Sequence, residues 1–243
     1  MTRCSRLLFL PMMKTPTTRP QGGVTVAAVI PVGPGDSWRP VATQVISVPP
    51  VAETLVVGTE PAPDTLPSGV RWIATARGRA RQLNAGARAS SAGLLWFLHS
   101  DSALGSALVP ALVEFASQDQ PTTVGYFRLG FADDGPPLTA LNAWGANLRS
   151  RWLDLPFGDQ GLLVPRAIWE TVGEFDESLP FGEDLDWVVR AKAAGFRLVQ
   201  LDATMVTSAR RYRQAGWLAT TLRHLALTVT LARAARRRAS RSR

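Results

Sequence analysis

The chain has 243 residues, of which 46% are hydrophobic and 19% are charged, proportions typical of one fair-sized globular domain or two small ones. Its single cysteine, Cys4, excludes an intrachain disulfide and a cysteine-rich metal site, so nothing marks the protein as secreted and the cytoplasm is the expected compartment. The net charge of +8 is local, because residues 210–243 hold ten arginines and no acidic residue, which argues against a nucleic-acid-binding surface spread over the whole domain.

The N-terminal segment is predicted to be a disordered leader, residues 1–22. Its apolar stretch LLFLPMM is short, holds a proline and lacks a small-residue cleavage site, so it does not match a signal peptide. No segment of the sequence approaches the roughly 18 uninterrupted apolar residues of a membrane span.

Four short apolar runs follow, each bounded by glycine, proline or polar residues, as is typical of strands covered on both faces of a parallel sheet. They lie at residues 24–32, 54–58, 70–75 and 94–99. Between the last two runs, Ala80, Leu83 and Ala87 share one face at helical spacing, with Ser91 as a fourth candidate, and the helix is expected to end before Gly93. Proline-rich loops are expected at residues 34–40 and 61–67.

The second half of the chain predicts a mixture of strands and helices. Strands are expected at residues 122–131, 161–165 and 196–201, and helices at residues 138–152 and 183–194. The predicted fold class is therefore α/β, with parallel strands first and mixed structure later.

Polar residues end the fourth apolar run. In open α/β sheets, ligands bind outside the carboxyl ends of the strands, which is where His99, Ser100 and Asp101 fall. If strand geometry persists to residue 101, alternation points the His99 imidazole and the Asp101 carboxylate the same way, toward a shared divalent cation. The alternative is that Asp101 or Ser102 caps a helix starting near Ala103, with His99 hydrogen-bonded at the sheet edge. The three residues alone leave both interpretations open.

The stretch GRARQLNAGARASSAGLLWFLHSDSAL resembles a segment of glycosyltransferase family 2, in which an Asn-x-Gly helix and an apolar strand lead to an Asp-x-Asp metal motif. More closely, it is similar to a bacterial subgroup with a His-Ala-Asp version of that motif, related to arsenosugar and carotenoid (diaponeurosporenoate-type) glycosyltransferases. Three further stretches agree: FGDQGLLVPRAIWETVGEFDE (157–177), FGEDLDWVVRAKAAGFRL (181–198) and TSARRYRQAGW (207–217). The resemblance runs from about Val24 to His224.

The resemblance implies the GT-A fold, a Rossmann-like nucleotide-binding half joined to an acceptor-binding half, over residues 23–209. Residues 210–243 are then a C-terminal helix and basic tail. The implied donor is a nucleotide sugar, whose diphosphate gains charge as the glycosidic bond breaks and needs a divalent metal ion, Mn²⁺ or Mg²⁺, held by Asp101 and His99. An imidazole ligand favours manganese over magnesium.

The residues implied to bind the nucleotide sugar are Pro31, Arg77, Arg79, Gln82, Asn84, His99, Ser100, Asp101, Arg210 and Arg211. The three arginines around Gly78 lie at the mouth of a strand and the start of a helix, where positive charge and backbone donors suit a diphosphate. We expect one of Arg77, Arg79 and Arg81 to take that role and the other two to be exposed helix arginines.

The implied catalytic residues are Asp184, as the base that deprotonates the acceptor hydroxyl, and Glu183 beside it. An acid in the first turn of a helix is stabilised by the helix dipole, and a second acid raises the local proton affinity. The alternative is that Glu183, Asp184 and Asp186 only stabilise a helix N-terminus. In the family, the preceding GDQG segment lines the acceptor side, which assigns Gly158, Asp159 and Gln160 to acceptor binding.

The sequence departs from the family pattern at two places that contact the donor. The aspartate that usually follows the second strand and contacts the nucleobase is replaced by Gly58 and Thr59, with Glu60 beyond them. The Asn-Glu pair that usually follows the first strand is replaced by PVGPGDSW, where Asp36 is the only acidic substitute. The donor nucleotide is therefore open among UDP, GDP and dTDP, with a UDP-sugar as the first choice.

The sequence thus predicts an inverting, metal-dependent glycosyltransferase acting on a hydroxyl acceptor. One alternative is a catalytically inactive nucleotide-sugar or glycan-binding relative. A nucleic-acid binder ranks last. Such a protein needs aromatic rings near its positive charge to stack on bases, and after Arg210 only Tyr212 and Trp217 occur.

The C-terminal helix carries a stripe of four apolar residues ahead of its arginines: Leu218, Leu222, Leu225 and Val229. This pattern predicts peripheral contact with an anionic membrane, at its inner face, and a lipid-like acceptor. The alternatives are that the stripe packs on the catalytic domain and that the arginine run is simply solvated.

Overall fold

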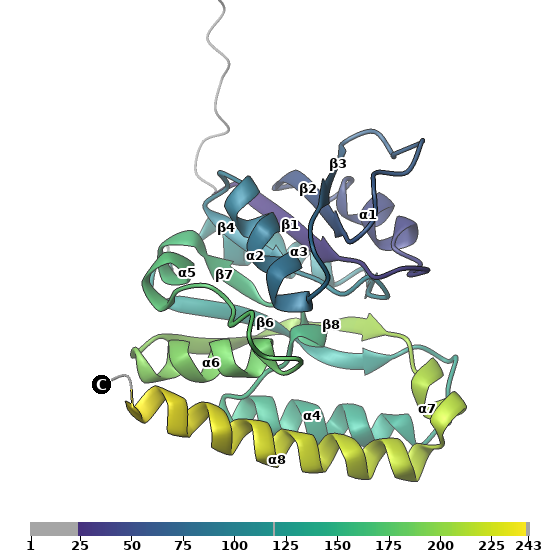
Figure 1. Ribbon diagram of the computed structural model, residues 1–243, viewed down its shortest axis with the longest axis vertical. Helices are drawn as coiled ribbons and strands as arrows, with labels where there is room; N and C mark the ends of the chain where they lie inside the picture. The colour runs from purple at the N-terminus through teal and green to yellow at the C-terminus, as the bar shows by residue number, and fades with distance from the viewer. Residues whose placement is uncertain (1–23, 119, 242–243) are drawn as a thin grey trace, which may run out of the picture.

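The computed structural model describes residues 24–118 and 120–241, and its strands form one mixed sheet between layers of helices (Figure 1). The strands are β1 (Val26–Pro31), β2 (Val51–Gly58), β3 (Val70–Ala74), β4 (Leu94–Phe97), β5 (Ala103–Leu104), β6 (Thr123–Phe131), β7 (Leu163–Pro165) and β8 (Arg197–Thr207). The helices are α1 (Arg39–Val45), α2 (Arg79–Ala89), α3 (Leu108–Ser117), α4 (Thr139–Leu153), α5 (Arg166–Val172), α6 (Glu183–Ala193), α7 (Arg210–Ala215) and α8 (Trp217–Arg241), with a 3₁₀ turn η1 (Gly158–Gln160).

The sheet has the order β3-β2-β1-β4-β7-β6-β8-β5. Its first four strands are parallel, β7 is antiparallel to both β4 and β6, β6 is parallel to β8, and β5 is antiparallel to β8. The prediction of an α/β fold with parallel strands first and mixed pairing later is confirmed. The carboxyl ends of β1, β2 and β4 meet at one edge of the sheet, where ligands bind in such folds.

Alternation along β1 assigns the helices to the two faces of the sheet. Val26, Ala28 and Ile30 pack in one core cluster with α1 and α3, whereas Ala27 and Val29 pack in another with α2, α5 and α6. All five side chains are fully buried. The first strands are continuous apolar runs in the sequence because helices bury both of their faces.

One edge of β6 is closed by side chains instead of by a strand. β7 is only three residues long and pairs with β6 at Gly125 alone, so the main-chain groups of Phe127 and Leu129 on that edge need other partners. The amide nitrogen of Gln160 donates to the Phe127 carbonyl at 3.1 Å. The amide of Asn147 accepts from the Leu129 N–H at 2.8 Å and donates to the Leu129 carbonyl at 3.0 Å. These bonds tie η1 and α4 to the sheet.

The C-terminal helix α8 is packed onto α6. Ala232 and Ala235 are buried against Leu185 and Val189 of α6. Near that contact the Arg238 guanidinium donates from Nε and Nη2 to the Asp186 carboxylate at 2.9 and 2.7 Å. No helix among residues 24–118 and 120–241 is both long and apolar enough to cross a membrane.

Several boundaries differ from the expected ones. Helix α2 ends at Ala89, short of Gly93, because Ser90 leaves the helix with a ψ of 151°. The Ser90 hydroxyl donates to the Glu53 carboxylate and accepts from the Ala92 N–H. Ser91 is therefore exposed and does not belong to the buried face of the helix. Strand β4 ends at Phe97, two residues before the expected end. Strand β8 continues to Thr207, six residues past the expected end, because β6 and β5 pair with its second half.

Three helices and one strand have no counterpart in the sequence prediction: α1, α3, α5 and β5. Helix α1 begins at Arg39, inside the segment expected to be a loop, and Pro40 occupies the first turn, where its missing N–H costs nothing. The remaining predicted strands and helices are present within three residues of their expected ends. The leader expected at residues 1–22 lies outside the described residues.

Replacing Arg238 with alanine should lower the free energy of unfolding by about 1–2 kcal/mol, because the buried Asp186 carboxylate would keep only Arg190 as a charged partner. Urea unfolding followed by circular dichroism measures the loss. The control is Arg236→Ala, an exposed arginine on the same helix, which should change stability by less than about 0.5 kcal/mol. Equal losses in the two variants would show that α8 does not depend on this ion pair.

Candidate functional site

A cleft of about 1260 Å³ opens at the carboxyl ends of β1 and β4 and extends to α4, α7 and α8. Its inner wall carries the side chains singled out at the end of the fourth predicted strand, His99, Ser100 and Asp101, together with Pro31 from the end of β1. The polar residues at this edge of the sheet therefore face a cleft, and their contact with a ligand stays a prediction.

The chain turns sharply after β4. The Ser102 hydroxyl accepts from the His99 N–H at 3.2 Å, and the Ser102 N–H donates to the His99 carbonyl at 3.2 Å. Strand geometry therefore does not persist to residue 101, so simple alternation does not align His99 with Asp101. The capping alternative is also wrong, because residues 103–104 form strand β5 and the next helix, α3, begins only at Leu108.

His99 is a half-buried side chain that lines the cleft. Its Nε2 has no hydrogen-bond partner among the described residues. Burial holds its pKa well below the ordinary value, and the nearby charges of Arg79 and Arg211 lower it further. The imidazole is therefore neutral near pH 7, with an Nε2 that is buried and lacks a partner among the described residues.

Asp101 and Asp36 are the carboxylates on this side of the cleft. Asp101 Oδ1 accepts from the Thr207 hydroxyl at 3.3 Å, and its Oδ2 lies 4.0 Å from Nη2 of Arg210. Asp36 Oδ2 accepts from the Gly33 N–H at 2.8 Å and from the Ser100 hydroxyl at 3.1 Å. The acid that replaces the family's usual Asn-Glu pair is thus held beside the cleft by the turn after β1.

These side chains supply only part of the ligand set that a metal ion needs. Among the described residues, no group of three or more His, Cys, Asp or Glu side chains is arranged to hold a metal. Mg²⁺ and similar ions are commonly held by one or two carboxylates, with substrate phosphates and water completing the shell. The Asp101 carboxylate and the unpartnered Nε2 of His99 are the groups in the cleft that match such a partial set.

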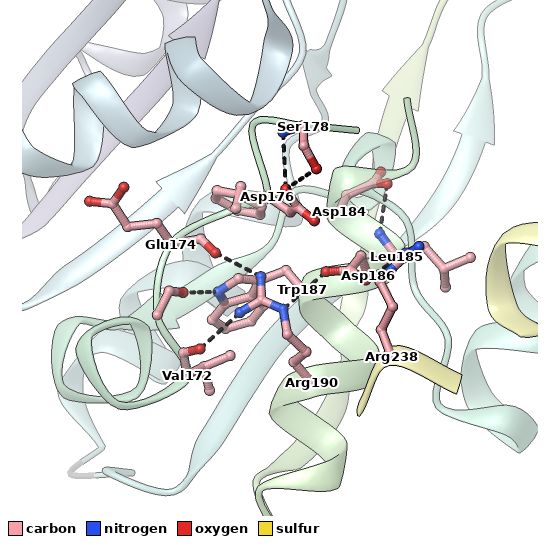
Figure 2. A network of polar contacts seen from close by, with 12 residues as sticks. Val172, Glu174, Asp176, Ser178, Asp184, Leu185, Asp186, Trp187, Arg190 and Arg238 are labelled. Atoms are coloured by element: carbon pink, nitrogen blue, oxygen red, sulfur yellow. Dashed lines mark hydrogen bonds and ion pairs between the residues drawn. The ribbon is translucent and has the colours of Figure 1, made fainter. Parts of the chain in front are cut away.

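Three acids in the first turn of α6 have three different partners. Glu183 is buried and forms an ion pair with Arg79, with Nε 2.8 Å from its Oε1. Asp186 is also buried and lies between Arg190 and Arg238, as Figure 2 shows. Asp184 alone lines the cleft. Asp184 also accepts from the Leu185 N–H at 2.7 Å, as the interpretation that these acids stabilise the helix N-terminus predicts, so both interpretations of Asp184 stay predictions.

Burial raises the pKa of Glu183, and the neighbouring Asp184 raises it further, while the Arg79 guanidinium opposes both effects. Arg79 and Glu183 thus hold each other at the wall of the cleft, with the Arg79 side chain still one-third exposed. Glu183 positions a cation at the cleft, and of the three acids in the first turn of α6 Asp184 is the one that lines it.

The η1 turn brings its main chain against Asp184. The Gly158 N–H donates to Asp184 Oδ2 at 2.6 Å, while Oδ1 accepts from the N–H of Leu185. A Cβ atom on Gly158 would lie 3.0 Å from Asp184 Oδ2, 3.2 Å from Nη2 of Arg79 and 3.2 Å from Nε2 of His99. A glycine at this position therefore lets three polar side chains from three elements converge on one point.

Asp159 points into the same cleft without a partner for its Oδ1 among the described residues. Burial raises its pKa to about 6, with Asp184 and Asp101 adding to the rise and Arg149 and Arg79 opposing it. Arg149 is a residue that sequence reasoning missed: its guanidinium stacks 3.8 Å from the ring centre of Phe157, and burial lowers its pKa. An isolated arginine in a predicted helix gives no sign that it faces a site.

Helix α7 forms the opposite wall. Arg210 and Arg211, both implied by the resemblance, line the cleft. Tyr212 follows them, and its hydroxyl lies 3.1 Å from Nδ1 of His224 on α8. With Arg79, Arg149 and Arg223, five guanidinium groups of the described residues surround the cleft, which suits a multiply charged anion.

Four implied site residues lie elsewhere. Gln82 donates to the carbonyls of Val32 and Val57, both at 2.7 Å, and so joins the ends of β1 and β2. Asn84 exchanges hydrogen bonds with the Phe175 main chain, and Gln160 closes the edge of β6. Arg77 is exposed and is absent from the cleft lining.

Of the three arginines near Gly78, only Arg79 therefore lines the cleft, since Arg81 pairs with Glu177 at 3.0 Å on the surface. That one of these arginines binds a diphosphate stays a prediction, for which Arg79 is the one in position. The structure also explains the missing aspartate after β2. A Cβ atom on Gly58 would overlap the ring of Trp72, so no larger side chain fits there without moving that ring.

The profile of the family described as Glycosyltransferase like family 2 matches residues 35–230 of this chain. A comparison with curated protein sequences gives no significant match. The structure is similar to that of GalNAc-T7 with UDP, GalNAc and Mn²⁺, with a TM-score of 0.56 and 12% sequence identity. It is equally similar to the mannosyltransferase PcManGT from Pyrobaculum calidifontis in complex with GDP-Man and Mn²⁺, with a TM-score of 0.56 and 16% identity.

A third similar structure, described as a mycobacterial protein, has a TM-score of 0.52 and 18% identity. The alignments cover 77%, 77% and 76% of this chain but 44%, 57% and 66% of the three others. The chain thus spans about half the length of the first two. At these identities the likeness establishes a shared fold, and the named glycosyltransferases confirm the GT-A expectation.

Replacing Asp159 with asparagine should stabilise the protein at pH 7 by on the order of 1–3 kcal/mol. With a pKa of about 6 in the folded state against 3.8 normally, Asp159 holds its proton more tightly when folded, so stability falls as pH rises from about 4 to 6. The variant should lack this fall and match the wild type below pH 4. Thermal unfolding across pH measures it, with the exposed Asp133→Asn as control. A variant no more stable than the control at pH 7 would contradict the assignment.

Proposed function

Because this chain belongs to the glycosyltransferase-like family 2, we propose that its cleft transfers a sugar from a nucleotide-diphosphate donor to a hydroxyl group of an acceptor. The observation that supports this is the composition of the cleft. Asp184 is one of four carboxylates of the described residues that line it and is held by main-chain N–H groups, and arginines from α2, α4, α7 and α8 line it as well. An anionic leaving group and a hydroxyl that must lose a proton need this combination.

The proposed reaction is a direct displacement at the anomeric carbon of the sugar. The acceptor oxygen forms a bond to that carbon as its proton passes to the Asp184 carboxylate, and the bond to the diphosphate oxygen breaks with its electron pair. The product is the glycoside with inverted configuration, and the nucleoside diphosphate leaves. The Gly158 N–H holds Asp184 Oδ2 at 2.6 Å, which fixes the base in one orientation.

Arg79, Arg210 and Arg211 are the groups proposed to bind the diphosphate. Their guanidinium groups present planar pairs of donors that match phosphate oxygens, and Glu183 orients the first of them. A divalent ion, when bound, adds Lewis-acid stabilisation of the leaving phosphate. Asp101 and the neutral imidazole of His99 are the proposed protein ligands for it, together with phosphate oxygens.

The donor class is a UDP- or GDP-sugar, since the two similar structures contain UDP and GDP-Man. A UDP-sugar remains the first choice. Because position 58 is a glycine, other groups must bind the nucleobase of the donor. Similarity of the sequence motifs to the arsenosugar and carotenoid subgroup supports a small or lipid-like hydroxyl acceptor. Thermal shift measurements over a panel of nucleotide sugars with Mn²⁺ would identify the donor, and stabilisation by none of them would count against the proposal.

The alternative of a catalytically inactive binding relative is motivated by the substituted positions at Gly58 and Asp36. Donor consumption measured with and without an acceptor separates the two. An enzyme consumes donor faster when acceptor is present, whereas a binding relative releases no nucleoside diphosphate under either condition.

Asp184→Asn should reduce transfer by on the order of 100-fold or more while donor binding survives, because the amide keeps the shape of the carboxylate but cannot take a proton. Initial rates and calorimetric titration with the donor measure the two effects separately. Glu183→Gln is the neighbouring control, with a smaller loss in rate expected. If Glu183→Gln proved the more damaging, the base would be Glu183, and undiminished turnover in Asp184→Asn would remove the base assignment altogether.

Chelation of divalent ions with EDTA should abolish transfer, and Mn²⁺ should restore it more fully than Mg²⁺ because a neutral imidazole suits transition ions. Asp101→Ala should remove metal-dependent donor binding, whereas Asp133→Ala, on the exposed loop after β6, should not. Donor titrations with and without each ion provide the measurement. Full activity in EDTA would contradict the metal assignment, and unchanged metal-dependent binding in Asp101→Ala would remove Asp101 from it.

A further inference from the structure

Helices α4 and α8 each present a row of large apolar side chains to solvent. On α4 the row is Leu141, Trp144, Leu148 and Trp152, and on α8 it is Leu218, Leu222, Leu225 and Val229. Spacings of three and four residues place each row on one helical face. Trp144 and Trp152 are 66% and 74% exposed, and the three leucines of α8 are 57–60% exposed. The α8 row therefore does not pack against the described part of the catalytic domain.

The two rows lie on neighbouring helices at one end of the molecule. Figure 1 shows α4 and α8 running side by side at one end of the protein, away from α1, α2 and α3. The helices are joined by Asn142, whose side chain accepts from Trp217 Nε1 at 2.6 Å and donates to the Thr221 hydroxyl at 2.9 Å. Nine of the thirteen exposed large apolar residues in the described chain lie on these two helices. Apolar exposure this concentrated is unusual for a surface that faces only water.

The charged residues within α4 and α8 are all basic. Neither α4 nor α8 contains an acidic residue. On α8 the apolar row continues at the same helical spacing into Arg233 and Arg236, both exposed, and Arg151 is exposed beside Trp152. Apolar side chains followed by arginines, with tryptophans among them, match the acyl region, headgroups and interface of an anionic bilayer. A second copy of the chain would instead bring arginines against arginines.

The cleft opens onto the same face. Leu141, Leu225 and Val229 belong to the exposed rows and also line the cleft, whose inner wall holds Asp101 and Asp184. The polar end of the cleft thus lies at Asp101 and Asp184, and its apolar end lies at the exposed rows. A lipid whose chains remain in a bilayer and whose headgroup enters this cavity would bring a hydroxyl to Asp184.

We propose that the α4–α8 face docks on an anionic lipid bilayer and that the acceptor is a membrane lipid whose headgroup hydroxyl enters the cleft between the two helices. Docking is inferred from the exposed residues of α4 and α8 and does not depend on the proposed function, whereas the identity of the acceptor rests on that function. The apolar rows supply the affinity, and the arginines select anionic headgroups.

The test is co-sedimentation of the full chain with vesicles of phosphatidylcholine, with and without phosphatidylglycerol. The test variant is Trp144→Gln/Trp152→Gln/Leu222→Gln, whose three side chains are exposed and lie outside the cleft lining. The wild type should bind the anionic vesicles, and the variant should bind them at least about tenfold more weakly. Arg233→Gln/Arg236→Gln should lose the preference for phosphatidylglycerol. The control is Val113→Gln, an exposed apolar position on α3, which should bind like the wild type.

Circular dichroism and thermal unfolding show whether each variant is folded, and tryptophan fluorescence gives a second readout, because bilayer insertion of Trp144 and Trp152 shifts the emission to the blue. Equal binding by the wild type and the triple variant, or no binding by the wild type, would overturn the docking proposal. A dimer in solution that the triple variant breaks, without vesicle binding, would also overturn it in favour of a second copy.

Vesicle binding requires no turnover, so failure of docking and failure of the proposed function are distinguishable. Transfer to water-soluble hydroxyl acceptors without vesicle binding would support the proposed function and overturn the docking proposal. If vesicle binding depends on the three residues, transfer to hydroxyl lipids in those vesicles should fall in the triple variant, while transfer to soluble acceptors should not. Equal rates on vesicle lipid for both proteins would remove the lipid acceptor.

Discussion

The short pairing between β6 and β7 is the constraint on which the site depends. Because the two strands meet at Gly125 alone, the rest of that edge of β6 must be satisfied by side chains, and the amides of Gln160 and Asn147 do this. Gln160 is part of η1, so the hydrogen bond that closes the sheet also fixes the turn whose Gly158 N–H reaches Asp184. Gln160, which the family resemblance assigns to acceptor binding, thus positions the groups that face the cleft.

The cleft holds polar groups at a cost in folding free energy. Nε2 of His99 and Oδ1 of Asp159 have no partners among the described residues, and burial disfavours the charged form of both side chains. Such costs persist where a ligand supplies the missing partners. By contrast, Asp186, two residues after Asp184, has two arginine partners and is absent from the cleft lining, so its role is to attach α8 to α6.

Elements with strong periodicity were predictable, as were residues whose role follows from chain position. The strand ending before His99 and the helix beginning at Glu183 are near their expected places, because long apolar runs and acidic first turns act locally. The partners of buried amides were not predictable: Gln82 and Asn84 bond to main chain from distant segments, which only the tertiary structure brings near. Arg149 was missed for the same reason, since a helix sequence does not say which face meets a cleft.

The central claim is that Asp184 is the single base of a direct displacement, with a cationic cleft holding the leaving diphosphate. That mechanism has no covalent intermediate, so one measurement tests it most directly: NMR of freshly formed product, compared with the donor at the anomeric carbon. The account predicts inverted configuration, appearing at the rate at which nucleoside diphosphate is released. Retained configuration in fresh product would contradict it, even if transfer itself were efficient.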